Sequence, residues 1–153
     1  MFIVSDNMID INVKGLLYVS KAIMPRMVER KTGHIINLCS VAGKEVYPKG
    51  NVYCASKFAV DAITKGMRQD LNPYGIKVTS IAPGMVQTEF SIVRFHGDQQ
   101  RADATYSGMT PLTGDDIADI IEFVITRPAH VAIADVLVFP TAQANSTITH
   151  REN

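Results

Sequence analysis

The stretch that decides the fold covers residues 34–84 and reads HIINLCSVAGKEVYPKGNVYCASKFAVDAITKGMRQDLNPYGIKVTSIAPG. It begins with a short apolar run at 34–39, which predicts a buried strand. Residues 53–71 then predict a long helix, which an Asn-Pro-Tyr-Gly turn closes. A second apolar run at 76–82 predicts another strand, stopped by a Pro-Gly pair. A strand, a helix and a strand in this order predict two parallel strands of one sheet.

The segment before this unit predicts one long helix. After Ser5-Asp6, apolar residues recur at helical spacing, and they are Met8, Ile11, Leu16, Val19, Ala22 and Ile23. Pro25 falls inside the predicted helix and predicts a kink. The Thr32-Gly33 pair is typical of a helix C-cap and predicts the end of the helix.

The segment after this unit continues the alternation. Residues 85–110 predict an irregular, mobile flap with helical pieces, and a Thr-x-x-Asp capping box predicts a helix over 113–125. A third strand is predicted over 134–139, and the rest is predicted to be a tail. The whole pattern predicts an α/β fold with a parallel sheet of about three strands.

The composition excludes several classes of protein. Fifteen basic and fifteen acidic residues cancel, and no basic stripe points to nucleic acid. The apolar runs are too short to span a membrane, and the start MFIVSD has no basic n-region, so no secretory leader is expected. Cys39 and Cys54 lack CxxC spacing, which fits a reducing cytoplasm. The four histidines show no metal-ligand spacing, so no metal is expected.

The residues richest in chemistry are Tyr53 and Lys57, four positions apart on the predicted helix. Residues i and i+4 share a helix face, so the lysine charge is expected within reach of the tyrosine hydroxyl. A cation lowers a tyrosine pKa, and a shift of roughly two units needs about 3 kcal/mol of differential stabilisation. Ser40 ends the strand thirteen positions upstream. The three residues predict proton transfer at an oxygen atom.

The predicted topology places the active site near Ser40. In parallel α/β sheets the active site lies beyond the carboxyl ends of the strands. Ser40 follows the strand at 34–39, and Pro83-Gly84 follows the strand at 76–82. Both are therefore expected at the same edge of the sheet.

Four segments, in the right order and spacing, resemble the short-chain dehydrogenase/reductase family; they are residues 12–15, 36–43, 53–57 and 83–88. The resemblance covers essentially the whole chain. Residues 89–91, 93–98 and 139–144 look more narrowly like the branch of NADP-dependent 3-hydroxy acid (serine or allo-threonine) dehydrogenases.

The resemblance implies a role for each member of a catalytic tetrad. Tyr53 would be the general acid/base on the substrate oxygen, and Ser40 would hydrogen-bond the same oxygen. Lys57 would lower the Tyr53 pKa and hold the nicotinamide ribose. Asn12 would position a water molecule that links Lys57 to solvent.

The resemblance also implies cofactor and substrate contacts. Pro83 and Gly84 would turn the backbone towards the nicotinamide of NADP, with NAD not excluded. Val86 would offer main-chain groups to the carboxamide, and the Thr88 side chain would bond it. Arg94 could pair with a substrate carboxylate in a bidentate fork.

Each of these residues also has an ordinary structural interpretation. Tyr53 and Lys57 could be a half-buried tyrosine and a solvated lysine, since the i, i+4 spacing is common on helices. Ser40 could simply end a strand, Pro83-Gly84 could be a plain turn, and Arg94 could be solvated.

The sequence departs from the family in what it lacks. Neither a GxGxxG turn nor the family's Thr-Gly-x-x-x-Gly-x-Gly version occurs, and the Asn-Asn-Ala-Gly motif is absent. We therefore expect one partial Rossmann-like domain over residues 1–153, the C-terminal half of a doubly wound sheet. It could be part of a longer enzyme, a truncated gene product, or an oligomerising module without catalysis.

Two hypotheses for the function follow. The first is an oxidoreductase that moves hydride between NADP(H) and a small hydroxy acid or carbonyl substrate. The second is an inactive fragment that acts only in oligomerisation or binding. In both, the exposed edge of the strand at 34–39 predicts pairing with another chain. The resemblance also implies a homo-oligomer, a dimer or tetramer, because in the family the two corresponding long helices build a dimer interface.

Overall fold

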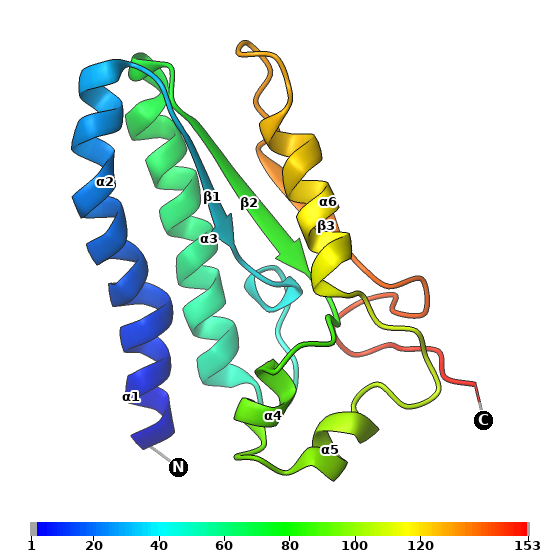
Figure 1. Ribbon diagram of the computed structural model, residues 1–153. Helices are drawn as coiled ribbons and strands as arrows, with labels where there is room; N and C mark the ends of the chain where they lie inside the picture. The colour runs from blue at the N-terminus through cyan, green and yellow to red at the C-terminus, as the bar shows by residue number, and fades with distance from the viewer. Residues whose placement is uncertain (1–2, 153) are drawn as a thin grey trace.

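The computed structural model describes residues 3–152 and shows three parallel strands in the order β1-β2-β3 (Figure 1). The strands are β1 (His34–Leu38), β2 (Lys77–Pro83) and β3 (Asp135–Val138). His34 lies opposite Lys77 in the first pair, and Pro83 lies opposite Val138 in the second. The predicted α/β class and parallel three-stranded sheet are confirmed.

Helices cover both faces of the sheet. On one face lie α2 (Leu16–Arg30) and α3 (Asn51–Leu71), and on the other lies α6 (Gly114–Ile125) (Figure 1). Successive residues of a strand point to opposite faces. Accordingly, Ile35 packs into the cluster with α2 and α3, whereas Ile36 packs into the cluster with α6.

The N-terminal helix is continuous but changes its winding. It starts as α1 (Ile3–Ile9), widens into the π-helical η1 (Asp10–Gly15) and continues as α2. The π segment was not predicted. Single π turns inside α-helices often mark functional sites, and this one contains Asn12.

The end of α2 differs from the prediction. Pro25 lies inside the helix, and the residue that closes it is Lys31, in the left-handed conformation with φ of 51°. Gly33 was predicted to be the cap. It instead lies against Met27, whose sulfur would be 2.8 Å from a Cβ atom at position 33.

The shorter elements agree with the predictions for the loops. The flap contains α4 (Phe90–Arg94) and α5 (Gln99–Ala104), and short 3-10 turns form η2 (Val41–Gly43) and η3 (Asn72–Tyr74). The capping box of α6 is present, since Thr113 and Asp116 exchange side-chain to backbone hydrogen bonds.

The residues after β3 were predicted to be a tail, and this prediction was wrong. They fold back in a hydrogen-bonded turn, in which the Ala144 N–H donates to the Ile148 carbonyl at 2.9 Å. The middle of the segment, at Gln143 and Ser146, contacts the loops that follow the other two strands, and its end extends away from them (Figure 1, red). Within residues 3–152, no helix is long and apolar enough to cross a bilayer.

Candidate active site

The candidate site lies where β1 and β2 end against the first turns of α3. Ser40 follows β1 and is buried, with 8% of its surface exposed. Its hydroxyl donates a long hydrogen bond of 3.5 Å to the carbonyl of Pro83, the last residue of β2. The two strand ends that the topology predicted at one edge are thus in direct contact.

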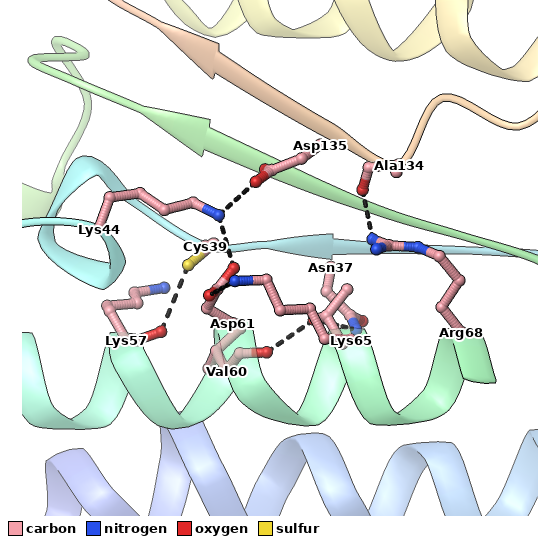
Figure 2. Close-up of polar contacts among 11 residues, drawn as sticks. Asn37, Cys39, Lys44, Lys57, Val60, Asp61, Lys65, Arg68, Ala134 and Asp135 are labelled. Atoms are coloured by element: carbon pink, nitrogen blue, oxygen red, sulfur yellow. Dashed lines mark hydrogen bonds and ion pairs between the residues drawn. The ribbon is translucent and has the colours of Figure 1, made fainter. Parts of the chain in front are cut away.

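The loop after Ser40 is held close to α3. The Ser40 hydroxyl accepts from the Ala42 N–H at 3.1 Å and so caps η2. A Cβ atom on Gly43 would lie 2.7 Å from the Lys57 carbonyl oxygen, so only glycine allows this approach. The Cys39 thiol donates to the same carbonyl at 3.4 Å (Figure 2). These contacts determine how far Ser40 lies from the helix that carries Tyr53.

Lys57 is directed at a backbone carbonyl. Its Nζ donates to the Leu38 carbonyl at 3.0 Å and lies 5.9 Å from the centre of the Tyr53 ring. Burial lowers the pKa of Lys57. An ammonium group has three donors, so the bond to Leu38 leaves two of them for other partners.

The expected effect of Lys57 on Tyr53 is not what the structure shows. Burial raises the pKa of Tyr53, with the Ser40 side chain acting in the opposite direction. Removing the phenol from water disfavours the phenolate, while the Lys57 ammonium faces Leu38 rather than the hydroxyl. The prediction of a lowered Tyr53 pKa is therefore wrong for this structure. Tyr53 is protonated at neutral pH and can donate a proton.

Asn12 is fixed to α3 between the two catalytic candidates. Its Nδ2 donates to the Ser56 hydroxyl at 3.0 Å, and that hydroxyl donates to the Tyr53 carbonyl at 2.8 Å. Asn12 lies in the π-helical η1, and the bond joins residues 44 positions apart. The expected water relay to Lys57 stays a prediction.

The predicted cofactor segment follows β2. The Val86 carbonyl accepts from the Tyr106 hydroxyl at 2.8 Å, and Val86 forms an isolated bridge with Leu112. Thr88 is exposed, and its hydroxyl accepts from the Phe90 N–H at 3.2 Å, next to the start of α4. These contacts fix the segment, and the carboxamide roles of Val86 and Thr88 stay predictions.

The flap brings Arg94 near the tyrosines. The guanidinium carbon of Arg94 lies 5.9 Å from the centre of the Tyr47 ring. Burial raises the pKa of Tyr47, and Arg94 acts to lower it. Phe90, also on α4, lies 5.6 Å from the Tyr53 ring, tilted by 43°. Arg94 is exposed and directed towards the candidate site, where an anionic group could reach it.

Tyr47 was missed by the sequence analysis. Its ring lies on Gly50, where a Cβ atom would be 2.2 Å from a ring carbon. The signal was an aromatic residue three positions before a glycine in the loop leading to the helix. The sequence analysis interpreted this segment only as part of a loop.

An ion network behind the site was also missed (Figure 2). The Lys44 Nζ binds the Asp61 carboxylate at 2.6 Å and also contacts Asp135 at the start of β3. Lys65 binds the other oxygen of Asp61 at 2.6 Å. Burial acts to raise the pKa of Asp61, but the two lysines outweigh it and the pKa is lowered. The network joins the loop after Ser40, α3 and β3.

No group of three His, Cys, Asp or Glu side chains in the described part of the chain is arranged to hold a metal ion. The donors gathered at the site are a hydroxyl, a phenol, an amine and a guanidinium, contributed by Ser40, Tyr53, Lys57 and Arg94. This donor set suits an oxygen-bearing or anionic organic ligand rather than a metal.

Known proteins share this sequence and arrangement. A sequence profile described as "short chain dehydrogenase" matches residues 4–98. The chain is 42% identical over 145 residues to an NADP-dependent 3-hydroxy acid dehydrogenase of Schizosaccharomyces pombe, covering 95% of this chain and 56% of that protein. It is 44% identical over 149 residues to an NADP-dependent 3-hydroxy acid dehydrogenase of Escherichia coli, covering 96% and 60%.

A solved structure shows the same fold. The closed form of a serine dehydrogenase complexed with NADP+ superimposes with a TM-score of 0.91 at 42% identity, covering 97% of this chain and 60% of that one. The chain therefore spans between 56% and 60% of the length of these three relatives. By sequence profile, by identity and by fold, this chain belongs to the short-chain dehydrogenase family.

Proposed function

We propose that this chain carries the catalytic half of an oxidoreductase that transfers hydride between NADP(H) and a small hydroxy acid or its carbonyl form. The observation that carries the proposal is the convergence of Ser40, Tyr53 and Lys57 where β1 and β2 end. Relatives with 42% and 44% identity are named NADP-dependent dehydrogenases, which supports the cofactor.

The residues present fit a nicotinamide ribose and a reacting oxygen. Lys57 has two donors left for ribose hydroxyls once Leu38 is bound. Pro83, Gly84, Val86 and Thr88 form the adjoining wall proposed for the carboxamide. The cofactor supplies or accepts the hydride, and the protein supplies orientation and a proton.

The proton step belongs to Tyr53. Its raised pKa keeps the hydroxyl protonated, so in the reducing direction it donates to the carbonyl oxygen as negative charge develops there. The Ser40 hydroxyl stabilises the same oxygen by a hydrogen bond. Asn12, held on Ser56, would orient the water that returns a proton towards Lys57.

Arg94 supports an acidic substrate. It extends from α4 towards Tyr47, on the side of the site occupied by Tyr53 and Phe90. A guanidinium forms two parallel hydrogen bonds with a carboxylate. A small 3-hydroxy acid would place its hydroxyl at Tyr53 and its carboxylate at Arg94.

The chain is also proposed to form a homo-oligomer, a dimer or tetramer. Ile11, Tyr18 and Val19 share one side of the N-terminal helix and are 72%, 69% and 61% exposed. Exposed apolar side chains gathered on one side of a helix mark an interaction surface, and β1 lies at one edge of the sheet that the described residues form. A monomeric mass by light scattering at micromolar concentration would contradict this proposal.

The second candidate function is an inactive oligomerisation or binding module. It is favoured by the same exposed apolar side chains and by the lack of a glycine-rich phosphate-binding turn in the sequence. A fluorescence titration of this chain with NADPH separates the two. Saturable binding that Tyr53→Phe leaves intact supports the enzyme. An absence of binding at millimolar NADPH would leave only the binding module for this chain.

A further inference from the structure

The C-terminal strap, residues 140–152, connects the loops that follow β1 and β2. The N–H of Ser146 donates to the Glu45 carboxylate at 2.8 Å, and Glu45 lies in the loop after Ser40. The N–H of Met85 donates to the side-chain oxygen of Gln143 at 2.8 Å, and Met85 lies in the turn after β2. Two residues of one short segment thus reach both loops of the candidate site.

The end of the strap reaches the flap as well. The Arg151 guanidinium donates to the Thr105 carbonyl at 2.9 Å, and the Glu152 N–H donates to the Gly108 carbonyl at 2.8 Å. Residues 105–108 follow α5, the last helical piece of the flap. The strap therefore holds three segments that are distant in the sequence but adjacent in the fold.

The Gln143 side chain is held at both ends of its amide. It is buried, with 6% of its surface exposed. Its Oε1 accepts from the Met85 N–H, and its Nε2 donates to the Asn145 carbonyl at 3.0 Å. Because both ends of the amide have partners of opposite kind, a flipped amide would face an N–H with its NH2 group and a carbonyl with its oxygen.

The contact between Gln143 and Met85 requires a glycine at position 84. A Cβ atom there would lie 2.2 Å from the Gln143 Oε1 and 2.8 Å from the Phe139 ring. Gly84 is not among the residues with positive φ, so its backbone conformation does not require glycine. The space is occupied by Gln143 and Phe139, which lie directly against the turn.

We infer that Gln143 is a positioning residue that sets the turn Pro83–Val86 from the C-terminal strap. Its carboxamide replaces the backbone partner that the Met85 N–H lacks once β2 has ended, and Gly84 leaves the room for it. The inference rests on the proposed function for its consequence: the turn held by Gln143 is the one proposed to face the nicotinamide carboxamide. Gln143 itself touches neither cofactor nor substrate in this scheme.

Amide hydrogen exchange of the 153-residue chain, followed by NMR, tests the inference. In Gln143→Met the side chain keeps its length but loses both hydrogen bonds, so protection of the Met85 amide should fall at least about tenfold. Gln143→Glu as the neutral acid, at about pH 4, keeps an oxygen acceptor towards Met85 and a hydroxyl donor towards Asn145, and protection should stay within about threefold of the wild type. The matched control is Gln69→Met, at an exposed glutamine of α3, which should leave Met85 unchanged.

Three results would overturn the inference. Unchanged Met85 protection in Gln143→Met is one. An equal loss in Gln143→Glu and Gln143→Met is another, because it would assign the effect to packing rather than to the hydrogen bond. Protection of the β2 amides reports in each variant that the sheet is folded.

The third result comes from NADPH titration. Gln143→Met should weaken NADPH binding at least about fivefold relative to Gln69→Met, the ratio expected for about 1 kcal/mol. Equal affinities despite a lost Met85 protection would contradict the positioning role. A wild-type chain that binds no NADPH contradicts the proposed function alone, and Met85 exchange then decides this inference by itself.

Discussion

Helix α3 and the C-terminal strap hold the same site from two sides, but by different means. On α3 the chemical groups are on the helix itself, since Tyr53 and Lys57 are one turn apart and Asp61 follows one turn later. The strap contributes no reacting group and acts through hydrogen bonds to Glu45 and Met85. The comparison shows that one part of a chain can carry the reactive side chains while another part positions the loops around them.

The largest loss of activity is expected at Tyr53, because α3 carries the reacting groups and the strap carries none. Tyr53→Phe removes the proton donor, so reduction of a small 3-oxo acid by NADPH should fall at least about a thousandfold. NADPH affinity should stay within about twofold, because the ring and its contact with Phe90 remain. Stopped-flow absorbance at the nicotinamide band measures turnover.

The control for this variant is Tyr74→Phe, at an exposed tyrosine just after α3. It removes a hydroxyl of the same kind far along the helix and should leave turnover unchanged. Full activity in Tyr53→Phe would mean that the proton comes from another group.

The next largest effect is expected at Lys44, which connects α3 to the loop after Ser40. Lys44→Met leaves the buried Asp61 with Lys65 as its remaining cation. Removing one of its two cations leaves the buried carboxylate only partly compensated, so the free energy of unfolding should fall by about 2 kcal/mol. Urea denaturation measures it, with Lys49→Met, at an exposed lysine of the same loop, as the control. A loss equal to that of Lys49→Met would show that the ion network does not stabilise the fold.

The same network predicts a pH dependence. The folded-state pKa of Asp61 is lowered, so its contribution to stability is complete above its unfolded pKa of about 3.9 and is lost as the pH falls through the folded value. The stability difference between wild type and Asp61→Asn should therefore shrink steadily below about pH 4. Urea denaturation between pH 2 and pH 7, a range set by that pKa of about 3.9, follows the difference. A difference that does not change with pH would mean that the carboxylate is not paired in solution.

The smallest effect is expected at the cap of α6, a local contact outside the compared regions. Thr113→Ala removes the capping hydroxyl, which should lower the free energy of unfolding by about 1 kcal/mol. Thr32→Ala, at an exposed threonine after α2, is the control. The result gives a scale for a local contact against which the long-range contacts of Lys44 and Gln143 can be compared. A loss as large as that of Lys44→Met would show that the long-range ion network stabilises the fold no more than one local cap does.

The sequence predicted the parts whose determinants are local. The strands follow from short apolar runs, and the capping box and the Tyr53–Lys57 pair follow from spacings of three and four residues. The strap and the ion network could not be predicted in this way. Lys44 and Asp135 are 91 positions apart, and Glu45 and Ser146 are 101 apart. Only the folded sheet brings such residues together.

The error over the Tyr53 pKa has the same origin. Spacing predicted that the Lys57 charge would be near the tyrosine, and the two side chains are indeed neighbours. Which carbonyl the ammonium binds, and how deeply the phenol is buried, depend on Leu38 and on the loop after it. Those contacts are tertiary, and burial decided the direction of the pKa shift.

The most direct test of the central claim is deuteride transfer from NADPH deuterated at C4 to a small 3-oxo acid, catalysed by this chain. Mass spectrometry of the product should show one deuterium, bound at the carbon that becomes the alcohol, with wild-type protein. Tyr53→Phe should reduce its formation at least about a thousandfold. Saturating NADPH without any deuterated product from the wild-type chain would contradict the account.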